Sequence, residues 1–133
     1  MNYLEKEIDS TLVLHALPHE KLSDDELSDL ITKLTTVFFS TKAKYLDPYQ
    51  LKSNKKHHDP EFWKKVDTLE NLEHPLLIVQ DSNIHAWKLE SSLDLKKLFS
   101  ETTGFPFWIA DDLFNVLIYM DDHDCIHISN STD

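Results

Sequence analysis

His123, Cys125 and His127 are the residues near the carboxyl end whose types and spacing could do chemistry. Alternate residues of a β-strand share one face, so the three side chains would form a row of imidazole and thiol groups, which zinc and copper accept as ligands. Same-face neighbours on a strand stand about 6–7 Å apart, too far for three to meet one ion unless the chain curls back at His123. We therefore favour a polar strand face, and a metal-binding enzyme or sensor remains the alternative.

Other catalytic motifs are missing from the chain. Its one glycine, Gly104, excludes the glycine-rich loops that cradle phosphates in dinucleotide and nucleoside-triphosphate enzymes. Its one cysteine, Cys125, excludes an internal disulfide and paired-cysteine zinc sites. Neither an HExxH pattern nor a serine elbow is present. We predict that the protein is not an enzyme and uses no cofactor.

The charge is uneven along the chain. The net charge of −11 comes from 24 acidic and 13 basic residues, and every basic residue is lysine. Residues 67–133 contain 13 of the acids and 3 of the lysines, a net charge of −10. Acidic surfaces often serve only solubility, but any partner of this half should be cationic. The lack of arginine weakens the case for direct nucleic-acid binding, the third alternative, through the lysines of the first half: Lys42, Lys44, Lys52, Lys55, Lys56, Lys64 and Lys65.

Helical patterns dominate the first half. Apolar residues between Leu4 and Leu17 fit either a short helix or a helix that runs into a strand; we predict a helix, which Pro18 ends. Ser23 and Glu26 have the spacing of a capping box, which predicts a helix from Asp24 whose apolar face reaches Phe38. Residues 40–59 are expected to form a long exposed connection. A helix capped by Asp59, with Pro60 at its first position, is expected to end at His74 and Pro75.

Strand patterns dominate the second half. Residues 76–80 and 84–89 flank turn-forming residues and predict a hairpin. A helix should restart at Ser91 and end at Gly104, which we expect in a left-handed conformation. Segments 105–110, 116–120 and 125–129 predict a three-stranded meander joined by two acidic turns, residues 111–114 and 121–124.

These elements predict one α+β domain spanning residues 1–133, helical over about 1–74 and sheet-rich over about 75–129. The expected sheet is antiparallel, with about five strands from the hairpin and the meander, and with helices packed mainly on one face. The sequence has no apolar run long enough to cross a membrane and no secretory signal pattern, so we expect a cytoplasmic protein without a membrane partner.

The acidic turns are the candidate partner-binding features, with Trp108 nearby as either an exposed anchor or a core residue. Successive meander turns lie at opposite ends of a sheet, about 15–20 Å apart, so one footprint need not contain both. We favour the turn 121–124, which has three acids in four residues. The candidate interface residues are Asp111, Asp112, Asp121, Asp122, Asp124, Trp108 and His123.

The segment FPFWIADDLFNVLIYMDDHDCIHIS, preceded by WKLESSLDLKKLF, resembles the closing part of small bacterial immunity proteins that neutralise polymorphic or contact-dependent growth inhibition toxins. The resemblance lies in the order of a tryptophan strand, a helix and a meander with acidic turns. It implies a cognate toxin domain as partner, commonly a nuclease, bound tightly and specifically. A nuclease is basic because it binds phosphate, and an inhibitor can offer carboxylates in place of phosphates.

Overall fold

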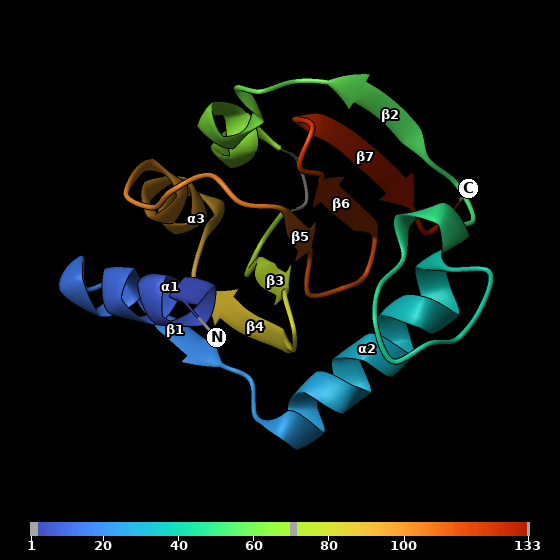
Figure 1. Ribbon diagram of the computed structural model, residues 1–133, viewed down its shortest axis with the longest axis horizontal. Helices are drawn as coiled ribbons and strands as arrows, with labels where there is room; N and C mark the ends of the chain where they lie inside the picture. The colour runs from blue at the N-terminus through green and yellow to red at the C-terminus, as the bar shows by residue number, and fades with distance from the viewer. Residues whose placement is uncertain (1–2, 70–71, 133) are drawn as a thin grey trace.

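A computed structural model of the chain describes residues 3–69 and 72–132. The strands of these residues form one seven-stranded antiparallel sheet (Figure 1). The strand order is β1-β4-β3-β5-β6-β7-β2. The α+β class is confirmed, with seven strands instead of about five. The strands are β1 (His19–Lys21), β2 (Lys55–His58), β3 (Leu76–Gln80), β4 (Ile84–Leu89), β5 (Phe107–Ala110), β6 (Val116–Met120) and β7 (Cys125–Asn130).

Helices cover both faces of the sheet (Figure 1). Helices α1 (Tyr3–Leu14) and α3 (Ser92–Ser100) and the 3-10 helix η2 (Phe62–Thr68) pack on one face, as predicted for most of the helices. Helix α2 (Asp24–Phe38) packs on the other face. The central strands are therefore buried on both sides, which explains why β3 and β5 are continuous apolar runs.

The two outermost strands were not predicted. β1 pairs with β4, and β2 pairs with β7, so both edges of the sheet come from the half expected to be helical. Every residue of β1 and β2 is exposed, so neither has the apolar alternation that marks a half-buried strand. The connection 40–59 also contains the short 3-10 helix η1 (Pro48–Gln50).

Helix α2 has the predicted bounds, whereas α1 ends at Leu14, before the predicted end at Leu17. The capping box of α2 is present: the Ser23 hydroxyl accepts from the Glu26 amide, and the Glu26 carboxylate accepts from the Ser23 amide. The helix predicted from Pro60 is instead the shorter η2, which begins at Phe62, and residues 70 and 71 of that prediction lie outside the described residues. Gly104 does not have a positive φ; α3 ends at Ser100, before it.

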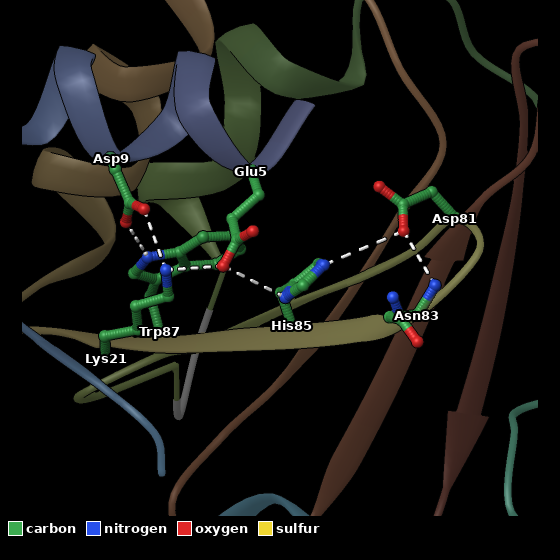
Figure 2. A network of polar contacts seen from close by, with 7 residues as sticks. All are labelled: Glu5, Asp9, Lys21, Asp81, Asn83, His85 and Trp87. Atoms are coloured by element: carbon green, nitrogen blue, oxygen red, sulfur yellow. Dashed lines mark hydrogen bonds and ion pairs between the residues drawn. The ribbon is translucent and has the colours of Figure 1, made fainter. Parts of the chain in front are cut away.

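A polar network attaches α1 to the sheet (Figure 2). The Lys21 ammonium donates to Glu5 at 2.6 Å and to Asp9 at 2.8 Å, and the Trp87 indole donates to Asp9 at 2.8 Å. Burial opposes the charged ammonium, but the bonds to Asp9 and Glu5 outweigh it and raise the pKa of Lys21. His85 lies 3.3 Å from the same Glu5 carboxylate. These acids are paired within the fold and are not free for a partner.

None of the helices in residues 3–69 and 72–132 is long and apolar enough to span a membrane.

Candidate partner-binding site

The two acidic turns share one construction. Asp111 accepts backbone hydrogen bonds from Asn115 at 2.7 Å and from Val116 at 2.9 Å. Phe114, the fourth residue of that turn, has a φ of 57°. An aspartate at the first position of such a turn takes up amides that the reversing chain leaves unpaired. Asp111 is 1% exposed, so it has a structural role and is not available as an interface residue.

Asp121 has the same role in the second turn. One carboxylate oxygen accepts from the amides of His123 at 2.8 Å and Cys125 at 3.0 Å, and the other lies 2.9 Å from Nε2 of His127. Burial favours the neutral acid, but the hydrogen bonds from His127 and from the two amides outweigh it and lower the pKa of Asp121. Asp121 is thus charged but largely committed to shaping the turn.

Asp122, His123 and Asp124 project from this turn into solvent. The side chains of Asp122 and His123 are 75% and 84% exposed and lie 3.6 Å apart. Within residues 3–69 and 72–132, neither Asp122 nor Asp124 has a lysine partner. Asp124 has a φ of 62°, a conformation that aspartate and asparagine tolerate better than most residues. The predicted acidic turn therefore presents two free carboxylates.

A cleft of about 450 Å³ lies beside this turn. We call it the turn cleft. It forms where the turn meets η2 and the connection from α3 to β5, three segments distant in sequence that converge at the same end of the sheet (Figure 1). Its lining contains aromatic side chains and carboxylates and includes no lysine or histidine: Pro60, Trp63, Phe99, Ser100, Thr102, Thr103, Gly104, Phe105, Phe107, Met120, Asp121, Asp122 and Asp124.

The lysines of η2 and α3 do not neutralise the turn cleft, because each of them has its own acidic partner. The pairs are Lys64 with Glu61 at 2.7 Å, Lys65 with Asp59 at 2.7 Å, Lys96 with Asp67 at 3.4 Å and Lys97 with Glu101 at 3.1 Å. The hydrogen bond from Lys65 is the main reason why the pKa of Asp59 is lowered. The negative charge of Asp122 and Asp124 consequently remains available to a cation from outside.

Trp108 belongs to the core. Its side chain is 2% exposed and stacks on Tyr119, with ring centroids 4.2 Å apart, beneath α2. The exposed-anchor interpretation of Trp108 is therefore wrong, because α2 covers the face of the sheet from which this ring projects. Burial, followed by the charge of Asp121, raises the pKa of Tyr119.

The two acidic turns lie at opposite ends of the sheet, as predicted. Ala110 pairs with Leu117 at one end of the β5–β6 hairpin, and Met120 pairs with Ile126 at the other end of β6. Asp112 is half-buried in the distant turn and does not join the turn cleft. Asp133, the last acid of the chain, lies outside the described residues.

The row of His123, Cys125 and His127 does not come together around one point. Cys125 and His127 share a face of β7, as expected, but both ring nitrogens of His127 have partners, Asp121 at 2.9 Å and Asn54 at 3.1 Å. The Cys125 thiol points to the His123 carbonyl at 3.8 Å. In residues 3–69 and 72–132, no group of three His, Cys, Asp or Glu side chains is placed to hold a metal ion.

The aromatic lining of the turn cleft was missed from the sequence. Trp63 lies on η2 and Phe99 on α3, and no local pattern distinguishes them from other core aromatics. Phe105, between Gly104 and Pro106, was assigned to a strand, whereas β5 begins at Phe107. Only the packing of η2 and α3 on the sheet brings these rings to the acidic turn.

A larger hollow of about 900 Å³ lies between α2, residues 43–45 and the turn of the β3–β4 hairpin. Its lining mixes Lys44 and His85 with Asp24 and Asp81, so it does not present a single sign of charge. The turn cleft is therefore the better candidate for charge-based recognition.

Comparisons with protein-family models, curated proteins and solved structures found no match to this chain.

Proposed function

We propose that this protein is an immunity-type inhibitor that binds a cognate toxin domain, a basic nuclease, in the cytoplasm. It acts without catalysis, by occluding the surface on which the toxin binds its substrate. The observation that carries the proposal is the turn cleft, where Asp122 and Asp124 stand free beside aromatic side chains and the lining holds no basic residue. In the proposed complex these carboxylates take the place of substrate phosphates on the nuclease.

The charge of the second half supports rapid binding. Residues 67–133 have a net charge of −10, from 13 acids and 3 lysines, which attracts a basic domain over distances comparable with the Debye length. Electrostatic steering raises association rates, whereas buried aromatic contacts lower dissociation rates. The turn cleft offers both kinds of group at one place.

The metal alternative has less support. A metal site needs ligands with free lone pairs, and Nε2 and Nδ1 of His127 already face Asp121 and Asn54. We therefore propose that the row of His123, Cys125 and His127 serves only to build the acidic turn and does not bind a metal.

The test first asks whether the gene immediately upstream encodes a protein that ends in a basic domain, and that domain is then the partner used. Its association with the full chain is followed by surface plasmon resonance at low ionic strength, together with protection of cells that express the toxin. Asp122→Lys should slow association at least about tenfold, because it reverses a free charge at the interface. Asp112→Lys is the matched control, since Asp112 holds the same position in the distant turn and undergoes the same change of charge.

The possible results distinguish the location of the interface from the function itself. If only Asp122→Lys slows association, the turn cleft and the proposed function are both supported. If only Asp112→Lys slows association, the interface lies at the other end of the sheet. Failure of the parent protein to bind or to protect would overturn the proposed function.

A further inference from the structure

We infer that the turn cleft is a receptor for one arginine side chain, with the guanidinium lying against the aromatic wall and bonded to Asp122 and Asp124. The inference rests on the proposed function in one respect, namely that the arginine belongs to the toxin domain. The chemistry of the cleft can be tested without that partner.

The aromatic wall is already assembled in the free protein. Phe99 stacks on Phe107 with ring centroids 4.4 Å apart, and Phe105 meets Phe99 and Phe107 edge-on at 6.0 and 6.1 Å. Phe99 and Phe107 are buried beneath the cleft, so the rings that a ligand can reach are those of Phe105 and Trp63, which are half-buried. Mutual packing fixes the phenylalanine rings, so a ligand meets a preformed surface and loses little free energy in ordering it.

An aromatic ring of the turn cleft already contacts a cation. The Nζ atom of Lys64 lies 5.5 Å from the centroid of the Trp63 ring. Cations are attracted to the face of an aromatic ring within about 6 Å, and tryptophan is the strongest of these acceptors. Trp63 therefore already lies beside a positive group, and an incoming guanidinium would share this ring with the Lys64 ammonium or displace it.

The carboxylates define the sign of the ligand. Asp121, Asp122 and Asp124 line the same cleft as the rings, so an anion would be repelled and a neutral apolar group would strip water from charges without replacing it. Acids alone would not define a site, because the first aspartate of each turn is explained by turn geometry. It is their position on the rim of an aromatic cleft that defines the ligand as cationic.

Shape and hydrogen bonding favour arginine over lysine. The cleft of about 450 Å³ is large enough for either side chain, so its volume does not decide between them. A guanidinium is planar, stacks on aromatic rings and donates to two carboxylates at once, whereas an ammonium is a strongly hydrated point charge.

The experiment titrates the full ¹⁵N-labelled chain with N-acetyl-arginine amide and follows chemical shifts by NMR. N-acetyl-citrulline amide is the matched probe, because it keeps the shape of arginine and removes the charge. We expect shifts confined to the Trp63 indole, the amides 102–105 and the turn 121–124, with citrulline binding at least about tenfold more weakly.

Two variants test the two halves of the site. Asp122→Asn with Asp124→Asn removes both free charges and keeps a residue that tolerates the positive φ at position 124. Gly104→Phe places a large side chain at the lining, where an added Cβ meets nothing within 4 Å and the backbone needs no positive φ. Each should weaken arginine binding at least about fivefold while the remaining amide shifts stay those of the parent fold.

Equal binding of citrulline and arginine, or shifts scattered away from the turn cleft, would overturn the inference. Arginine binding at the cleft by a protein that does not bind the upstream toxin domain would support the inference and refute the proposed function. Toxin binding without arginine binding would do the reverse.

Discussion

Replacing Asp121 with alanine should destabilise the fold strongly, although the residue lies in a surface turn. Its carboxylate, 14% exposed, receives hydrogen bonds from the amides of His123 and Cys125 and from the His127 ring. A hydrogen bond to a charged group contributes about 1.5–3 kcal/mol. The His123 amide can turn to water, so we count the other two bonds and expect a loss of about 3–6 kcal/mol.

The assay is urea denaturation at neutral pH, with Asp122→Ala as the control. Asp122 makes no backbone bond in the described part of the chain, and its replacement should change the free energy of unfolding by less than about 0.5 kcal/mol. For a chain of this size the Asp121→Ala loss corresponds to a fall in Tm of about 10–20 °C. A loss below about 1 kcal/mol would refute the role assigned to this carboxylate.

The pH dependence gives the same prediction a second readout. Because the pKa of Asp121 is lowered on folding from its ordinary value of 3.8, its ionisation stabilises the protein above that value. This contribution is lost as the pH falls through the lower pKa of the folded state. The difference in stability between parent and Asp121→Ala should therefore be constant near neutral pH and shrink only below about pH 3.8. A difference that shrinks already at pH 6 would point to another group.

Two further substitutions test local claims. Ser23→Ala removes the hydroxyl that caps α2 and should cost about 1 kcal/mol in urea denaturation, whereas Ser28→Ala inside the same helix should not destabilise; equal effects would contradict the capping box. Cys125→Ser should leave toxin binding nearly unchanged, because the hydrogen bond of the thiol in residues 3–69 and 72–132 is to the His123 carbonyl; loss of binding by a folded variant would restore the metal alternative.

The elements that the sequence predicts best are those that residues close together in the chain stabilise. The capping box places the start of α2 at Asp24, and the turn residues Asp81–Asn83 place the hairpin of β3 and β4. Both depend on contacts between residues close in the chain. The class of the fold follows from them, because tightly linked strands form antiparallel sheets.

The edge strands could not be predicted in this way. His19–Lys21 and Lys55–His58 have exposed side chains and are held by main-chain bonds to β4 and β7, which no side-chain pattern reveals. The same holds for Trp108, because its burial depends on α2 crossing the second face of the sheet. The alternation of side chains along a strand shows from which face of the sheet an aromatic residue projects, but not which element covers that face.

The candidate site was predicted in part. The turn 121–124 and its exposed acids follow from composition and spacing, but which acids are free depends on where each carboxylate points. The first aspartate of each turn binds the backbone, and within residues 3–69 and 72–132 Asp122 and Asp124 have no lysine partner. The aromatic half of the turn cleft depends wholly on tertiary packing.

In the turn 121–124, different residues serve folding and recognition. Asp121 alone supplies the carboxylate that shapes the reversal, and position 124 needs a residue that accepts a left-handed backbone. The side chains at positions 122 and 123 have neither of these roles, so replacing them should change the stability of the fold very little. If the protein binds a toxin as proposed, substitutions at these two positions would change its specificity one residue at a time while the fold stays the same.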